Sequence, residues 1–212
     1  MSCSCINSTN IGSIDSWCLV WREGDERQSS IEKHNEFTRY RTDASNAIKG
    51  VVRFNDCVRL VKWWRYQMQS GSTVFGNDEE DKKVPSFLLI LLCARAYDDF
   101  SVRKTYPETL AAWFGYLAHV TGNNEDVIFN DYIKKHENPD GDWLVLDPMD
   151  DSNNIVGNWS KTKINEIADW FQFARDKMIQ AIRHDQEGDD QKSLDCLIEL
   201  FGNSISNQCK NA

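Results

Sequence analysis

The stretch Val84-Pro-Ser-Phe-Leu-Leu-Ile-Leu-Leu-Cys-Ala94 holds the longest apolar run of this 212-residue sequence. A proline is tolerated in the first turn of a helix, and residues 87–94 are apolar without interruption, so the run predicts a helix that is apolar on every side. Such a helix has to be surrounded by other elements, and we expect it at the centre of the fold. It is much shorter than the ~20 residues that a membrane-spanning helix requires.

Helical periodicity extends on both sides of this run. The apolar residues at positions 58, 61 and 64 form a stripe, and Asn55 or Asp56 is expected to cap the helix that carries it. Pro107 and Gly122 bound another helix, and Ser160 caps a long amphipathic one. The patterns predict helices from about residue 36, over 55–69, from 85, over 107–120, from 160 to about 185, and over 194–201.

Strand signals are few. The run Trp17-Cys-Leu-Val-Trp21 has strand composition and precedes a turn, Trp143-Leu-Val-Leu146 reads as a short strand, and residues 126–132 favour strand over helix. Residues 69–83 and 147–154 read as a polar loop and an extended turn. We therefore predict a mainly α fold, a helical bundle with one or two short strands. Its predicted divisions are an N-terminal remnant or linker (1–35), a helical domain (36–188), and a short helix with a polar tail (189–212).

Charge and cysteine content narrow the classes of function. The net charge is −9, and a chain of this sign is repelled by phosphate backbones unless its cations are focused on one face. Seven irregularly spaced cysteines indicate reduced, buried thiols, and the four histidines form no ligand pattern, so no metal site is expected. The N-terminal residues lack the features of a signal peptide, and we expect a soluble protein of the cytoplasm or nucleus without a membrane partner.

Three constellations could carry chemistry. In Val58-Arg-Leu-Val-Lys-Trp-Trp64, Arg59 and Lys62 project from one helix face, where they suit a polyphosphate; the alternative is a solvated basic edge. At the start of the apolar helix, Ser86 and free N–H groups can meet a phosphate while Phe87 stacks on a base. The alternative is that Ser86 caps its own helix and Phe87 packs in the core.

The third constellation is Leu146-Asp-Pro-Met-Asp-Asp-Ser-Asn-Asn154. Its paired carboxylates could bind Mg²⁺ or act as acid and base. The alternative, which the composition favours, is that these side chains close their own turns by hydrogen bonds to the backbone.

The order of these three motifs resembles the C-terminal domain of 2′-5′-oligoadenylate synthetases and, more distantly, cyclic GMP-AMP synthase and its relatives. The resemblance covers roughly residues 36–180. It implies a helical bundle that packs against a nucleotidyltransferase sheet domain with ATP between them, and it assigns Arg59 and Lys62 to the triphosphate. The synthetases usually carry Gln-Tyr where this chain has Ser86-Phe87, and the cyclic-dinucleotide relatives use serine followed by an aromatic residue.

The resemblance also implies catalysis by two Mg²⁺ ions held by a Gly-Ser loop, an Asp-x-Asp pair and a third aspartate. Residues 1–58 contain no such series, so the chain reads as the C-terminal part of such an enzyme, with the sheet domain largely missing, and no catalysis is expected from it alone. Mg²⁺ would enter only with a catalytic half supplied elsewhere. A truncated gene model, a splice form and a stand-alone domain all remain open.

Double-stranded RNA is the activating partner in part of that family, bound by a basic spine before the Arg-Leu-Val-Lys motif. Here only Lys49 and Arg53 are basic in that segment, which predicts at most weak RNA binding through a fuller-length form. The resemblance implies the ATP-clamping half of a template-independent nucleotidyltransferase of the 2′-5′-oligoadenylate synthetase type, an RNA sensor of innate immunity. The alternative is a non-catalytic helical module, a remnant of an enzyme, that binds a nucleotide or a protein partner.

Overall fold

The computed structural model describes residues 17–20, 26–29, 31–47, 52–71, 84–133, 136, 138 and 141–209. Helices dominate this part of the chain, which confirms the mainly α prediction. In chain order the elements are β1 (Trp17–Val20), β2 (Glu26–Ser29), α1 (Ile31–Ala47), α2 (Phe54–Gly71), α3 (Ser86–Phe100), α4 (Tyr106–Gly122), β3 (Leu146–Asp147), β4 (Asp150–Asn154), α5 (Lys161–Gln186), α6 (Asp190–Phe201) and α7 (Ser204–Cys209).

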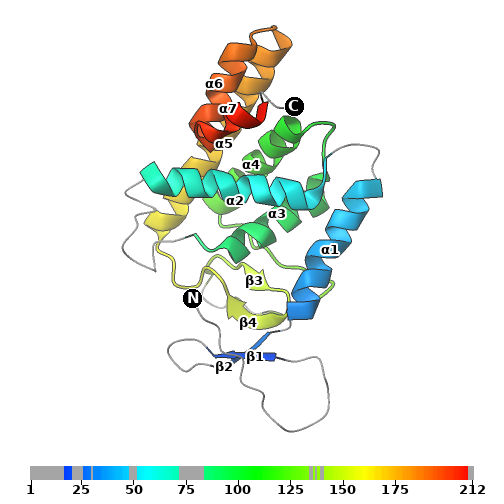
Figure 1. Ribbon diagram of the computed structural model, residues 1–212. Coiled ribbons are helices and arrows are strands. Elements are labelled where there is room, and N and C mark those ends of the chain that lie inside the picture. The colour runs from blue at the N-terminus through cyan, green and yellow to red at the C-terminus, as the bar shows by residue number, and fades with distance from the viewer. Residues whose placement is uncertain are drawn as a thin grey trace.

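The apolar helix α3 lies in the middle of the bundle, as its sequence predicts. It contacts α1, α2 and α4, and Figure 1 shows these helices around it. Seven of its residues are buried: Leu88, Leu89, Leu91, Leu92, Cys93, Ala94 and Ala96. Its last turn is exposed. None of the described helices is both long and apolar enough to cross a membrane.

Aromatic rings join α2 to the long pair α4 and α5. The buried indole of Trp64 lies 4.9 Å from the ring of Phe114 and stacks on Phe171 at 5.4 Å between centroids. Ring pairs of this geometry are favourable beyond the area that they bury. α6 packs back on α5 and also contacts α2. Figure 1 shows α6 and α7 beside part of α5 at one end of the molecule.

Helix α1 is held against the far end of α3 by a buried guanidinium. Arg41 donates from Nε to Asp98 Oδ1 at 2.9 Å and from Nη2 to Asp98 Oδ2 at 2.6 Å. Its guanidinium also lies 4.0 Å from the centroid of the Phe37 ring. Because Arg41 is only 4% exposed, this two-bond pair replaces the water that the guanidinium loses on burial.

The strand predictions hold only in part. β1 is confirmed, and β2 pairs with it antiparallel where no second strand was expected. Residues 150–154, expected to be a turn, form β4 and pair antiparallel with β3. The expected strand at 126–132 is wrong: this segment makes one isolated parallel bridge, from Val127 to Val145, and then turns.

Several helix ends also differ from expectation. α2 begins at Phe54, so Asn55 and Asp56 lie inside its first turn and do not cap it from outside. α1 begins at residue 31, α6 at residue 190, and α7 lies in the expected polar tail. Ser160 does cap α5, since its Oγ accepts the N–H of Lys163 at 3.2 Å.

Candidate functional site

The N-terminus of α3 is open where the helix meets solvent. Pro85 occupies the N-cap position with φ −62° and ψ 141°, and no side chain caps the helix. Ser86 is therefore the first helical residue, and the alternative in which it caps its own helix is wrong. The first N–H groups of a helix have no carbonyl in a preceding turn, and they carry the positive end of the helix dipole. An exposed hydroxyl and these N–H groups together suit an anion.

Lys62 lies on the α2 face that packs along α3. Its side chain is half-buried, and desolvation lowers the pKa of its ammonium below the usual value, with a further lowering by the nearby Arg65 cation. The neighbouring Cys93 thiol on α3 acts in the opposite direction. A partly desolvated ammonium gains more from an added anion than one in bulk water, because the local dielectric is lower.

Arg65 joins α2 to the start of α3. Its Nη1 donates to the carbonyl oxygen of Val84 at 2.5 Å, one residue before Pro85. Its Nε is buried, and the described residues offer it no hydrogen-bond partner. Sequence reasoning missed Arg65, although it follows Lys62 by the same three-residue spacing that separates Arg59 from Lys62, and that spacing was a usable signal.

Arg59 lies toward the other end of α2. Its side chain is 77% exposed, and it pairs with Asp56 at 3.6 Å. Asp56 also accepts a hydrogen bond from the hydroxyl of Tyr106, at the start of α4. Among the described residues, no hydrogen bond or ion pair joins the Arg59 side chain to Ser86 or Phe87.

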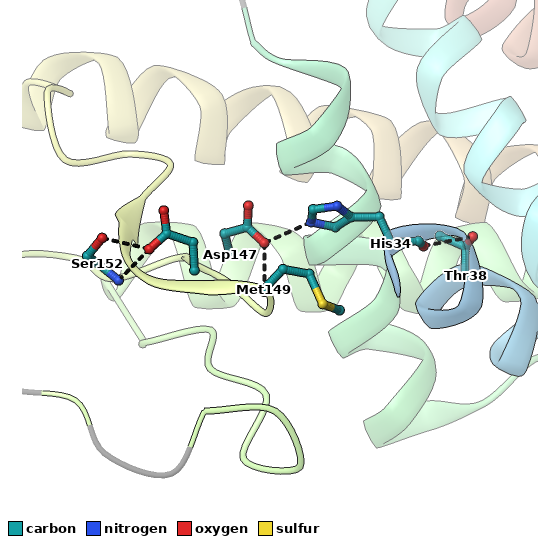
Figure 2. A network of polar contacts seen from close by, with 6 residues as sticks. His34, Thr38, Asp147, Met149 and Ser152 are labelled. Atoms are coloured by element: carbon teal, nitrogen blue, oxygen red, sulfur yellow. Dashed lines mark hydrogen bonds and ion pairs between the residues drawn. The ribbon is translucent and has the colours of Figure 1, made fainter. Parts of the chain in front are cut away.

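Phe87 contacts a histidine from a distant part of the sequence. Its ring is half-buried, and it meets the ring of His34 at 5.0 Å between centroids and 89° between planes, which is an edge-to-face pair. The Nε2 atom of His34 lies 2.8 Å from Asp147 Oδ1. Figure 2 shows the imidazole of α1 pointing at this carboxylate. The alternative in which Phe87 packs in the core does not include this contact with His34, which is itself bonded to Asp147.

Asp147 fixes the turn that follows β3. The same Oδ1 atom accepts the N–H of Met149 at 2.8 Å, and Asp150 Oδ1 accepts both the N–H and the hydroxyl of Ser152 (Figure 2). These bonds confirm the turn-closing alternative for this segment. Within the described part of the chain, no three His, Cys, Asp or Glu side chains gather as ligands of a metal ion.

Ser86 and Phe87 lie at the start of α3, where Arg65 of the adjacent helix α2 bonds to the carbonyl of Val84. Lys62 of α2 lies farther along α3, near Cys93. His34 was missed because 113 residues separate it from Asp147 and no local pattern reports such a contact. Arg53 is exposed just before α2, and Lys49 lies outside the described residues.

Comparisons with known proteins find relatives of this chain. No family model matches the sequence. The cyclic AMP-AMP-AMP synthase of Escherichia coli (strain MS 115-1) is 27% identical over 149 residues, which are 69% of this chain and 42% of that protein.

Two solved structures share the fold. E. coli MS115-1 CdnC with ATP matches with a TM-score of 0.72, and the CdnC:HORMA-deltaN complex with a TM-score of 0.73, both at 25% identity. Each covers 92% of this chain, and 57% and 56% of the CdnC chains are covered in return. The chain therefore spans about half the length of the relatives it matches.

The bundle corresponds to the helical C-terminal part of a nucleotidyltransferase, as predicted. These similarities support a relationship to the nucleotidyltransferase superfamily with its cyclic GMP-AMP synthase-like enzymes, and nothing in them singles out the 2′-5′-oligoadenylate synthetases.

Proposed function

We propose that this chain supplies the surface that holds a nucleoside triphosphate, ATP in the first instance, in a nucleotidyltransferase of the cyclic-oligonucleotide-synthase type that acts in innate defence. Lys62 and Arg59 contact the triphosphate, Ser86 and the first N–H groups of α3 bind a phosphate, and Phe87 stacks on the base. One observation carries the proposal: the half-buried ammonium of Lys62 lies beside a helix whose N-terminus has no side-chain cap.

The relatives support this assignment. The matched CdnC structure contains ATP, and the Ser86-Phe87 pair has the serine-aromatic form that the resemblance ascribes to cyclic-dinucleotide enzymes. The oligoadenylate form of the prediction has no such support, nor does double-stranded RNA as a partner. The described residues gather no metal ligands, so the proposal routes no step through a metal held by this chain, and it assigns no bond-forming step to these residues.

Equilibrium binding of ATP to the purified chain, with and without Mg²⁺, tests the proposal. We expect binding to the wild type and loss of binding in the Arg59→Ala/Lys62→Ala variant. The matched control is Arg183→Ala/Lys192→Ala, which removes the same charge from exposed ion pairs at the end of α5 and at the start of α6. Equal weakening by both pairs, or no binding to the wild type at millimolar ATP, would contradict the proposal.

The second candidate is a non-catalytic module that binds a protein partner. The observation that favours a protein partner is the match to CdnC in complex with HORMA-deltaN, whose TM-score of 0.73 is as high as that of CdnC with ATP. A chain that binds no ATP but co-elutes with a HORMA-domain protein in size-exclusion chromatography would support this candidate over the first.

A further inference from the structure

His34 lies between two groups that reach it from distant segments of the chain. On one side, Asp147 Oδ1 is 2.8 Å from Nε2, and on the other the ring of Phe87 lies 5.0 Å away, edge-to-face. The carboxylate is itself fixed, because it is buried and its Oδ1 also accepts the N–H of Met149. Figure 2 shows the imidazole aligned along this hydrogen bond. The orientation of the His34 ring is therefore set from the β3–β4 turn.

Phe87 depends on that ring because core packing surrounds only part of it. The side chain of Phe87 is half-buried, whereas the next residues of α3, Leu88 and Leu89, are fully buried. A half-buried ring at a helix start can change its rotamer unless a neighbour holds it. The perpendicular contact with His34 is such a neighbour, and an edge-to-face pair is a favourable arrangement of two rings.

We propose that His34, oriented by Asp147, is a positioning residue that holds the Phe87 ring in place to stack on the nucleotide base. This inference rests on the proposed function, since it concerns the base-contacting part of the same site. It predicts that His34 contributes to recognition of the base and not of the triphosphate, which Lys62 and the start of α3 contact.

A purely structural role for His34 makes a different prediction. α1 is anchored to α3 at a second point by the buried pair of Arg41 and Asp98, eleven residues of α3 beyond Phe87. Loss of the His34 ring therefore leaves α1 attached. If His34 served only to attach α1, its loss would disturb the whole site, and ligands with and without a base would be affected equally.

The experiment compares ATP with inorganic tripolyphosphate, which has the phosphates and no base, in binding to the full chain. His34→Gln keeps a donor for Asp147 and removes the ring. We expect it to lower ATP affinity by about three- to tenfold and to leave tripolyphosphate affinity unchanged. Phe87→Leu should have the same selective effect, and the double variant should be no worse than either single one. His34→Phe, which keeps a ring and loses the donor, should recover part of the ATP affinity.

Controls separate this inference from the proposed function. Arg41→Gln weakens the other attachment of α1, and it should lower the melting temperature without a selective loss of ATP. An unchanged ATP affinity in His34→Gln, or equal losses for both ligands, overturns the positioning role while the proposed function stands. If the wild type binds neither ligand, the proposed function fails. In that case chemical unfolding of His34→Gln, Phe87→Leu and the double variant measures the coupling between the two rings. Additive losses of stability overturn the coupling, and non-additive losses support it.

Discussion

Two neighbouring helices of the core, α3 and α4, begin in opposite ways. At α4, Thr105 Oγ1 accepts the N–H of Glu108 at 3.3 Å, and Glu108 Oε2 accepts the N–H of Thr105 at 3.2 Å, a complete capping box with a proline in the first turn. At α3, Pro85 stands at the N-cap position without a side-chain bond. The same chain thus closes one helix start with its own side chains and leaves the other accessible.

The difference indicates where the molecule keeps stability and where it keeps a binding surface. A side-chain cap contributes about 1 kcal/mol to a helix, and α4, α5 and α6 each have one. The α3 start lacks this contribution. Phe87 belongs to it, Arg65 bonds to Val84 just before it, and Lys62 of α2 lies farther along α3, near Cys93. We interpret the open α3 start as a place for an anionic ligand and the closed α4 start as purely structural. Four predictions sharpen this comparison.

The largest effect is expected at Lys62. Its half-buried ammonium faces α3, whereas the Arg59 guanidinium is exposed and already paired with Asp56. Hydrogen bonds to charged groups contribute about 1.5–3 kcal/mol each, so Lys62→Ala should lower the affinity for ATP on the order of 10- to 100-fold. Arg59→Ala should weaken it only severalfold. Isothermal titration calorimetry measures both, and a reversed order would mean that the exposed cation is the main phosphate contact.

Opposite changes in stability and binding are expected at Ser86. A carboxylate at the first helical position interacts favourably with the positive end of the helix dipole and stabilises the helix by about 0.3–1 kcal/mol. Ser86→Asp should therefore raise the melting temperature. The same carboxylate repels a phosphate at that position, and ATP affinity should fall by about tenfold.

The matched control for Ser86→Asp is Ser160→Asp at the start of α5, which adds the same charge at a helix start that already has a cap. It should leave ATP affinity unchanged. A similar loss of affinity in both variants would show that only net charge matters, and would remove the distinction between the α3 start and the other helix starts.

The pH dependence of ATP binding follows from the lowered pKa of Lys62. Desolvation lowers this pKa below its ordinary value of 10.5, so the ammonium loses its proton as the pH rises through that lowered pKa. ATP affinity should then fall with rising pH, whereas the always-charged Lys62→Arg variant should show a flatter profile. The stability of the chain without ATP changes in the opposite direction. Lys62 binds its proton more tightly in the unfolded chain, so its contribution to the free energy of unfolding grows as the pH rises from the lowered pKa to 10.5. Parallel profiles for the two proteins would exclude Lys62 as the titrating group.

Local signals in the sequence were enough for the centre of the fold. The apolar run after Pro85 predicted α3, the cap at Ser160 predicted the start of α5, and the glycine at position 122 predicted the end of α4, because each depends on residues within one or two turns. β4 was mistaken for a turn. Its composition is typical of turns, and its pairing depends on Asn154, whose amide donates to the Trp143 carbonyl and accepts from the Val145 N–H.

The residues of the candidate site likewise divide into those that local motifs predict and one that depends on tertiary contacts. Lys62, Ser86 and Phe87 came from short motifs, and Arg65 was within reach of the same spacing argument. His34 was not, because its importance rests on a ring contact across 53 residues and a hydrogen bond across 113. Whether a half-buried ring is held by a neighbour is a property of tertiary packing, which no local pattern in α1 or α3 reports.

The smallest effect on binding is expected where the helix start is closed. Thr105→Ala removes the hydroxyl that accepts the N–H of Glu108, and it should cost about 1 kcal/mol of unfolding free energy. ATP affinity should stay unchanged, because the hydrogen bonds of Thr105 go to Glu108 and Thr109 of its own helix and not to the residues assigned to the ligand. Chemical unfolding and calorimetry on the same sample measure the two quantities. A loss of ATP affinity as large as the loss of stability would show that the α3 and α4 starts are coupled through the core, and the division between a structural and a binding helix start would then be wrong.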